Sequence, residues 1–179
     1  MSRATLDPAR AALVVIDVQE AFRKAVPTFE ETARRTAVLV QGAHALGLPV
    51  IVTEQYPRGL GDTVPEVLDA LDGEPRLAKS VFSAARAEGF DLQGRDQALV
   101  CGIEAHVCVS QTVLDLLADG VEVHVAADAT ASRTAENHAA GLHRAEAAGA
   151  TLSSVEMALF ELVGRAGTPQ FKTIQGLIR

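Results

Sequence analysis

The sequence predicts an α/β protein, built as a three-layer α-β-α sandwich around a parallel, Rossmann-like sheet of about six strands. Short apolar runs without polar alternation recur along the chain, and such runs are typical of strands that are covered on both faces. Stretches with helical periodicity separate them, which is the order that right-handed βαβ crossovers require. We find no internal repeat, linker or low-complexity tract and therefore expect a single domain over residues 1–179.

The predicted strands are recognised by their apolar content and by the residues that bound them. Residues 11–16 form a continuous apolar run, whereas residues 121–126 alternate as a strand nearer the sheet edge does. Residues 76–79 are assigned mainly because Gly73 and Pro75 precede them. The expected strands cover residues 11–16, 49–53, 76–79, 98–101, 121–126 and 150–152.

The predicted helices are marked by capping signals and by glycines at their ends. Thr28 and Glu31 form a capping box that opens a helix running to about Gly47. A second capping box, Ser153 with Glu156, opens an apolar helix. Residues 58–63 are expected to be a loop. Of the remaining helices, one is expected to begin at about residue 63, one to end at Gly120, one to cover residues 134–148 and one to follow Pro169.

The composition argues against several classes of function. A net charge of −7 without a basic cluster disfavours nucleic acid and anionic membranes as partners. No apolar run reaches the roughly 18 residues of a membrane span, and the first residues lack the apolar core of a secretory signal. Two cysteines without such a signal favour a reducing, cytoplasmic setting over a disulfide framework.

Three reactive side chains stand at the ends of three different predicted strands. Asp17 follows the first strand, Lys79 the third and Cys108 the fourth, in the first turn of a helix whose N-terminus favours thiolate over thiol. Because parallel strands bring their carboxyl ends to one rim, we expect the three to meet there as base, cation and nucleophile. Each also has a structural interpretation: a helix cap, a solvated surface lysine and a buried apolar cysteine.

These residues carry a family resemblance. Residues 15–19 (Val-Ile-Asp-Val-Gln), Lys79 and residues 101–109 (Cys-Gly-Ile-Glu-Ala-His-Val-Cys-Val) resemble the cysteine hydrolases of the isochorismatase-like superfamily. Residues 53–61 and 168–175 further resemble the subgroup known as isochorismatase domain-containing proteins. The resemblance covers nearly the whole chain, and the order and spacing of the motifs make it specific.

The resemblance implies a hydrolase that acts on carbon–nitrogen bonds other than peptide bonds, with Asp17, Lys79 and Cys108 as its catalytic triad and a thioester intermediate. It also implies a cis peptide between Ile103 and Glu104, which would turn the Glu104 backbone N–H toward the same point as that of Cys108 and so form an oxyanion hole. Family habit and an apolar C-terminal helix further suggest a homo-oligomer.

The substrate is expected to be a small molecule in a pocket beside these groups. Candidate pocket residues, each of which could equally serve in packing, are Gln19, Phe22, Glu54, Tyr56, Phe82 and His106. For His106 we favour a structural role, because short turns often use side chains to satisfy backbone groups. The size of the leaving group and the identity of the acid depend on the shape of the pocket, which the loop over residues 54–63 sets.

The resemblance also argues against two branches of the superfamily, although a metal-dependent nicotinamidase-type amidase stays open as an alternative. Metal-dependent nicotinamidases place an Asp-x-His pair and a further histidine near the second strand, where this chain has residues 54–56 (Glu-Gln-Tyr). No histidine occurs between His44 and His106, so no three-ligand metal site and no cofactor is expected. Vinyl-ether-cleaving isochorismatases lack a cysteine at the position of Cys108.

Two alternatives of other classes stay open from the sequence. A catalytically silent member could keep the fold as a binding or scaffold module and dock a partner through residues 168–179. A thiol redox sensor would need a resolving partner for Cys108, and Cys101, seven positions back in a strand, is badly placed for that role.

Overall fold

The computed structural model describes residues 5–179 and centres on a six-stranded sheet whose pairings are all parallel, in the order β3-β2-β1-β4-β5-β6. The strands are β1 (Ala11–Ile16), β2 (Val50–Gln55), β3 (Arg76–Lys79), β4 (Gln97–Ile103), β5 (Glu122–Ala131) and β6 (Thr151–Ser153). The strand order reverses between β1 and β4. Ligands of open α/β sheets bind outside the carboxyl ends of the strands at such a switch point.

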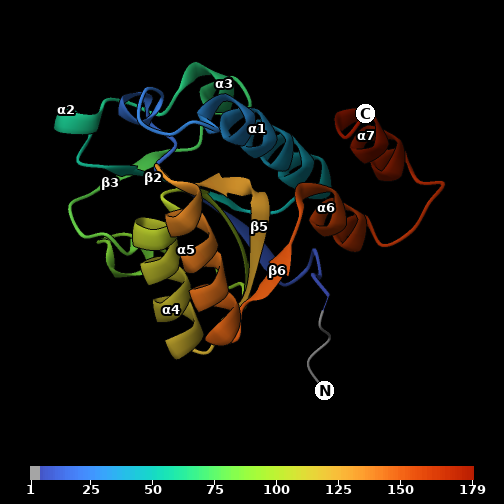
Figure 1. Cartoon of the computed structure of the whole chain (residues 1–179). Helices are drawn as coiled ribbons and strands as arrows, with labels where there is room; N and C mark the ends of the chain where they lie inside the picture. Colours follow the sequence, from blue (N-terminus) through green and yellow to red (C-terminus); the bar gives the residue numbers. More distant parts are fainter. Residues whose placement is uncertain (1–4) are drawn as a thin grey trace.

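Helices cover both faces of the sheet, which confirms the predicted three layers (Figure 1). In Figure 1, α1 and α6 lie over one face and α4 and α5 over the other, while α7 packs outside against α1 and α6. The helices are α1 (Phe29–Leu46), α2 (Pro57–Leu60), α3 (Pro65–Leu68), α4 (Ser110–Ala118), α5 (Ala135–Ala147), α6 (Val155–Val163) and α7 (Pro169–Leu177). The turn of α2 occupies the first half of the loop predicted over residues 58–63.

The central strand β1 explains why its sequence does not alternate. Leu13 and Val15 point to the core shared with α1 and α6, and Val14 and Ile16 point to the core shared with α4 and α5. All four side chains are fully buried, so both faces of the strand need apolar residues.

Strand β5 extends beyond its predicted end. The pairing with β4 moves from Val100–Val125 to Gly102–Thr130, which leaves extra residues of β5 in a bulge. The polar Asp128 falls in this irregular stretch, so the sequence pattern predicted an end where the strand only bends. The continuation carries the chain to the rim beside the end of β4.

The two predicted capping boxes are realised only in part. Thr28 is the N-cap of α1, but it makes no side-chain cap; instead its carbonyl accepts the Thr32 hydroxyl at 3.0 Å. For α6 the N-cap is Ser154 rather than Ser153, and its hydroxyl accepts from the Met157 N–H at 3.2 Å.

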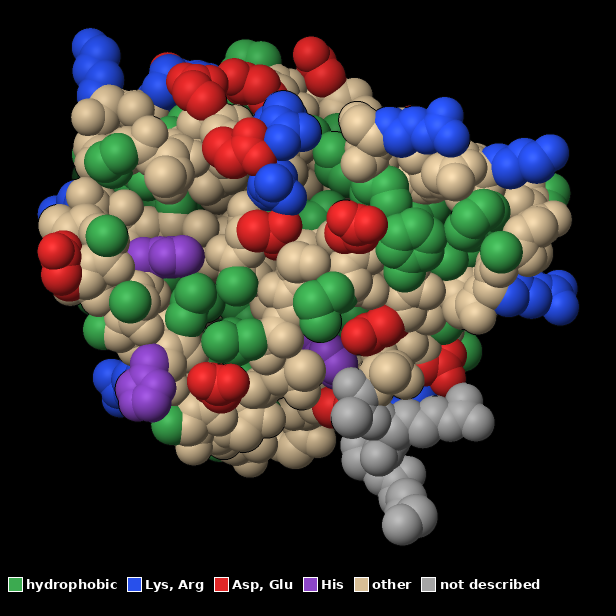
Figure 2. Space-filling view, turned by 45° about the vertical axis from the view of Figure 1, so that its right-hand side comes forward, with side chains coloured by type: hydrophobic (Ala, Val, Ile, Leu, Met, Phe, Trp, Pro, Cys, Tyr) green, Lys and Arg blue, Asp and Glu red, His purple; other side chains and the backbone are tan. Residues whose placement is uncertain are grey.

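Hydrophobic side chains gather on the face that carries α6 and α7 (Figure 2). Met157 and Phe160 are exposed there, and the Phe160 ring lies against Phe171 with 6.1 Å between the ring centroids. No helix within residues 5–179 is long and apolar enough to cross a membrane.

Candidate active site

The three predicted reactive side chains lie at one rim of the sheet. Asp17 follows β1 directly and adopts a left-handed conformation with φ of 52°, which turns the chain away from the strand. Lys79 is the last residue of β3, and Cys108 lies in a π-helical turn, Ala105–Val109, between β4 and α4. Because β2 separates β1 from β3, the long side chain of Lys79 has to reach past β2 to meet Asp17.

Lys79 and Asp17 form a fully buried ion pair. Lys79 Nζ donates to Asp17 Oδ2 at 2.8 Å, and neither side chain has any exposed surface. The ammonium also donates to Gln55 Oε1 at 2.7 Å and to the Phe82 carbonyl at 3.0 Å, so its hydrogen-bonding capacity is met inside the protein. Such pairs are retained only with this degree of satisfaction, because isolated buried charges are very costly.

Two β2 residues that sequence reasoning missed complete the arrangement. The Thr53 hydroxyl donates to Asp17 Oδ1 at 2.7 Å, which leaves each carboxylate oxygen with one strong donor. Gln55 bridges Lys79 and the chain beyond it, because its amide nitrogen donates to the Ser80 carbonyl at 3.0 Å. Their only signal in the sequence is their place at the carboxyl end of a predicted strand.

The surroundings of the Cys108 thiol disfavour its ionisation and so oppose the stabilisation of the thiolate that the helix N-terminus predicts. Burial raises the pKa of Cys108 to about 12, and the negative charge of Asp17 acts in the same direction. Lys79 lowers this pKa but does not outweigh burial and Asp17. The sequence argument considered only the helix N-terminus and omitted the desolvation of the sulfur. Ionisation of Cys108 therefore requires transfer of its proton to a neighbouring base.

The turn that carries Cys108 is held by backbone and side-chain contacts. The predicted cis peptide between Ile103 and Glu104 is present. The Glu104 carbonyl accepts from the N–H groups of Val107 and Val109 at 3.0 and 3.2 Å. On the far side the Cys108 carbonyl accepts the Thr112 hydroxyl at 2.6 Å.

Glycines allow the chain to pass unusually close on both sides of this turn. Gly102 has a φ of 119°, and a Cβ built there would lie 2.0 Å from the Ile16 carbonyl oxygen. A Cβ on Gly141 of α5 would lie 2.6 Å from the Ala105 carbonyl. The turn is therefore fixed between the end of β1 and α5, and neither contact leaves room for a side chain.

Cys108 lines a pocket of about 470 Å³ at this rim. The pocket walls are Ala21, Phe22, Ala25, Gln55, Leu60, Phe82, Glu104, Val107, Cys108 and Arg133. Phe22 and Phe82 are two of the candidate pocket residues from the sequence, and most of the other wall residues are apolar. A pocket of this size and character suits a small molecule.

Four predicted pocket residues are not among those lining it. Gln19 is buried and donates to the Gln55 and Gly61 carbonyls at 3.0 and 2.7 Å. Glu54 is also buried and accepts from the Thr63 N–H at 2.8 Å. Both side chains hold the segment between β2 and α3 and are used for structure rather than directed at the pocket.

Tyr56 and His106 are the other two. Tyr56 is 59% exposed and lies outside the pocket lining. His106 Nδ1 lies 3.0 Å from the Ser132 hydroxyl oxygen, which agrees with the structural interpretation of this histidine. Arg133, the neighbour of Ser132, does line the pocket and was missed because β5 was predicted to end too early.

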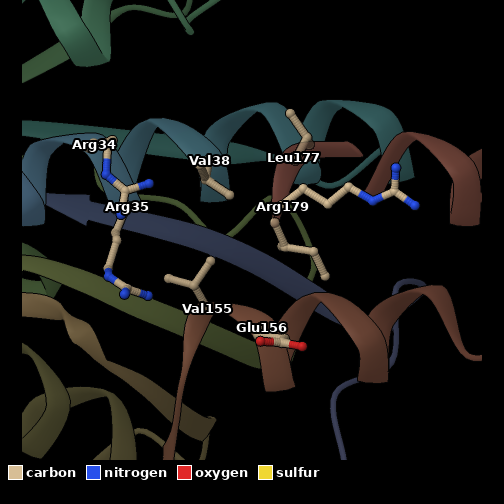
Figure 3. A pocket seen from close by; sticks show the side chains of 8 residues that line it. Arg34, Arg35, Val38, Val155, Glu156, Leu177 and Arg179 are labelled. Atoms are coloured by element: carbon tan, nitrogen blue, oxygen red, sulfur yellow. The ribbon is translucent and has the colours of Figure 1, made fainter. Parts of the chain in front are cut away.

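A second cavity, of about 250 Å³, lies between α1, α6 and α7 and contains none of these residues (Figure 3). Its walls include Arg34, Arg35, Val38, Val155, Glu156, Leu177 and Arg179. The two α1 arginines are already paired with Glu31, and Arg35 also with Asp128. Across residues 5–179 we find no group of three His, Cys, Asp or Glu side chains able to hold a metal ion.

A parallel sheet with a thiol, a carboxylate and an ammonium at one rim, beside a small pocket, defines a hydrolase-type α/β protein. The model of the Isochorismatase domain matches residues 11–157, and the chain belongs to that family. Isochorismatase domain-containing protein 2 of Pongo abelii is 42% identical over 175 residues, which cover 96% of this chain and 84% of the relative. The predicted subgroup is thereby confirmed.

Two solved structures show the same fold. The MAR1 ribonuclease of Caenorhabditis elegans is 38% identical with a TM-score of 0.91, over 97% of this chain and 92% of that one. YcaC of Pseudomonas aeruginosa was solved with hexane-2,5-diol and covalent acrylamide. It is 26% identical with a TM-score of 0.89, and the match covers 99% of this chain and 93% of that one.

Proposed function

We propose that this protein is a cysteine hydrolase that cleaves an amide-type carbon–nitrogen bond of a small molecule through a thioester. The observation that carries the proposal is the position of the Cys108 thiol. It lines an apolar pocket close enough to Asp17 to feel its charge, and the Asp17 carboxylate is itself ion-paired with Lys79. A nucleophile, a base and a cation gathered at one rim are the parts that covalent acyl transfer needs.

The acylation step begins from the neutral thiol. Asp17 takes the Cys108 proton as the sulfur attacks the amide carbonyl carbon, and the backbone N–H groups of Glu104 and Cys108 stabilise the oxyanion that forms. Asp17 then gives the proton to the leaving nitrogen. The C–N bond breaks, the amine departs, and a thioester remains on Cys108.

Hydrolysis of the thioester reverses these roles. Asp17 takes a proton from water, the oxygen attacks the thioester carbon, and the proton passes to the departing Cys108 sulfur. The carboxylic acid leaves and the thiol is restored. Throughout, Lys79 keeps the Asp17 carboxylate oriented, because it donates to Asp17 Oδ2, and its positive charge stabilises the negative charge that develops at the sulfur.

The relative YcaC gives independent support. Its structure contains covalent acrylamide, an electrophile that thiolates attack. A nucleophile able to add to the activated alkene of acrylamide is therefore present in that protein, which shares the fold and about a quarter of the sequence with this chain; such an adduct supports a reactive nucleophile rather than cleavage of the amide bond.

The decisive experiment is a screen of small amides and ureas for release of ammonia or amine, with the Cys108→Ala variant as the blank. We expect Cys108→Ala, Asp17→Asn and Lys79→Met to lose turnover of any substrate found, the first by at least about 10³-fold. Undiminished turnover in Cys108→Ala would remove the nucleophile. Absence of both turnover and Cys108 acylation with electrophilic amides would favour the catalytically silent alternative.

The name of the C. elegans relative raises ribonuclease activity as a second candidate. The net charge of −7 and the apolar pocket walls give little to bind a phosphate backbone. Incubation with single-stranded RNA should therefore leave it intact, and cleavage that is lost in Cys108→Ala would overturn this view.

We further propose a cytoplasmic homo-oligomer. The exposed Met157 and Phe160 on α6 offer an apolar contact surface, and both cysteines are free. Light scattering should give a mass above that of one chain, and Phe160→Glu should reduce it. A monomeric mass for the unsubstituted protein would contradict the oligomer.

A further inference from the structure

The hydroxyl of Thr112 makes two hydrogen bonds, and together they join parts of the chain that are far apart in sequence. Its Oγ1 donates to the Cys108 carbonyl at 2.6 Å and accepts the Ala84 N–H at 2.8 Å. Thr112 lies in α4, Ala84 begins the short helical turn Ala84–Arg86 that follows β3, and both residues are fully buried. The first bond is common for a threonine in a helix, whereas the second requires a segment from elsewhere in the fold.

The segment that Thr112 holds, residues 81–84, also supplies two acceptors to the ammonium of Lys79. Lys79 Nζ donates to the Phe82 carbonyl at 3.0 Å and lies 3.3 Å from the Val81 carbonyl. The Phe82 side chain forms part of the pocket wall. The positions of the ammonium and of this wall therefore depend on how residues 81–84 are fixed.

The side chains at the pocket end of this segment restrain it little, because Val81 is 44% exposed and Phe82 is 53% exposed. Its two ends are held by hydrogen bonds instead. Gln55 of β2 donates to the Ser80 carbonyl at 3.0 Å, and Thr112 accepts the buried amide at the other end. A buried N–H without an acceptor costs free energy comparable to a lost hydrogen bond, so the segment is expected to move when that hydroxyl is removed.

We propose that Thr112 is a positioning residue whose hydroxyl couples the cation to the nucleophile, by fixing the carbonyl acceptors of Lys79 relative to the backbone of Cys108. The inference rests on the proposed function for the roles of these two residues, but their coupling can be measured without turnover. The charge of Lys79 favours ionisation of the sulfur, whereas Asp17 and Glu104 oppose it. A displaced ammonium therefore leaves the sulfur less reactive.

The first test measures the rate at which iodoacetamide alkylates Cys108; the sulfur bonds to carbon, iodide leaves and the thiol proton passes to base. Thr112→Val replaces the hydroxyl by a methyl group, Thr112→Ala removes it without placing a methyl against the Cys108 carbonyl, and Thr112→Ser keeps it. The matched control is Thr32→Val. Thr32 is a buried threonine of α1 whose hydroxyl also donates to the carbonyl four residues back, at 3.0 Å, but joins no distant segment within residues 5–179.

The two variants without the hydroxyl should be alkylated at least about tenfold more slowly than the native protein, which is the factor that one hydrogen bond represents. Thr112→Ser should stay within about threefold of the native rate, and Thr32→Val should leave it unchanged. Urea denaturation shows which variants are folded under the conditions of alkylation. A native rate in a folded variant without the hydroxyl, or an equal loss in Thr112→Ser, would overturn the proposal.

The second test asks whether Thr112 acts through Lys79. In the Lys79→Met protein, adding Thr112→Val should slow alkylation by no more than about twofold, because the effects of two residues that act through one another do not add. A threonine that only supports the turn around Cys108 would cause the same loss in both backgrounds. That result would overturn the proposal.

The third measurement needs no reactive thiol. Exchange of the Ala84 N–H with deuterium, followed by NMR, should be at least about tenfold faster in Thr112→Ala than in the native protein, because the amide has lost its acceptor. Thr32→Val should not change it. Equal exchange in Thr112→Ala and the native protein would refute the link. Faster exchange together with a Cys108 that iodoacetamide does not alkylate would instead refute the hydrolase and leave the link standing.

Discussion

Lys79 Nζ lies 2.8 Å from Asp17 Oδ2 in a position where neither side chain reaches solvent. Removing two charges from water is expensive, and well-packed apolar residues are often at least as stable as such a pair. The pair is therefore better explained by its effect on Cys108, whose pKa Asp17 raises and Lys79 lowers. The two residues change the proton affinity of the Cys108 thiol in opposite directions.

Breaking this pair should destabilise the protein strongly. Lys79→Met leaves the Asp17 carboxylate buried with Thr53 as its remaining side-chain donor, and we expect the free energy of unfolding to fall by about 3–5 kcal/mol. Adding Asp17→Asn should restore part of that loss, because the unpaired charge is then gone. Urea denaturation of the single and double variants measures both effects.

The matched control is Arg86→Met, which breaks an ion pair with Asp119 in which both side chains are about half exposed. That change should cost no more than about 1 kcal/mol. If Lys79→Met lowered the free energy of unfolding by a similarly small amount, the buried ion pair between Lys79 and Asp17 would be contradicted.

Asp17→Asn should separate proton affinity from catalysis. The substitution removes a charge that raises the Cys108 pKa and keeps Lys79, which lowers it, so the pKa should move down from about 12. Turnover should nevertheless fall by about 10²-fold or more, because the base is lost. The pH profile of iodoacetamide alkylation measures the first effect and amide hydrolysis the second. An unchanged or raised pKa would contradict the assignment of Asp17, and Asp119→Asn serves as a surface control.

The buried thiols should also make stability fall at alkaline pH. Burial raises the pKa of Cys101 to about 12, above its value of about 8.5 in an unfolded chain. Between these values the folded state binds the proton more tightly, so this stabilisation is complete below pH 8.5 and is lost as the pH rises. Cys101→Ala should therefore make the decline of the free energy of unfolding with pH less steep by about 1.4 kcal/mol per pH unit. This change in slope does not depend on how much the substitution destabilises the protein at neutral pH. Denaturation of both proteins at pH 9 and 10 provides the test, and parallel slopes would contradict it.

Much of this fold could be predicted because its strands obey simple rules. The bounds of β1 and β3 agree with the predicted residues 11–16 and 76–79, since buried strands need apolar runs and the flanking residues break them. The meeting of Asp17 with Lys79 followed from topology, because parallel strands end at one rim.

What could not be predicted depends on distances that sequence patterns do not contain. Gln19 and Glu54 looked like pocket residues, but they satisfy backbone groups of a neighbouring segment that only the folded chain brings near. The pKa of Cys108 depends on how much water its sulfur loses, which local helix position does not reveal. Arg133 lies at the rim because the bulge in β5 lets that strand continue to residue 131, and the sequence pattern does not predict this continuation.

Gly141 should be as sensitive as any residue that touches the substrate. Alanine normally stabilises a helix by about 1 kcal/mol over glycine, but here its Cβ would lie 2.6 Å from the Ala105 carbonyl and 2.8 Å from the His106 nitrogen. Those are backbone atoms of the turn that carries Cys108, so α5 or the turn must move. Gly176→Ala in α7 is the matched control, because nothing lies within 4 Å of its Cβ. We expect Gly141→Ala to lower both the unfolding free energy and Cys108 alkylation, while Gly176→Ala leaves alkylation unchanged and does not lower stability. Equal behaviour of the two variants would mean that α5 does not fix the position of the turn.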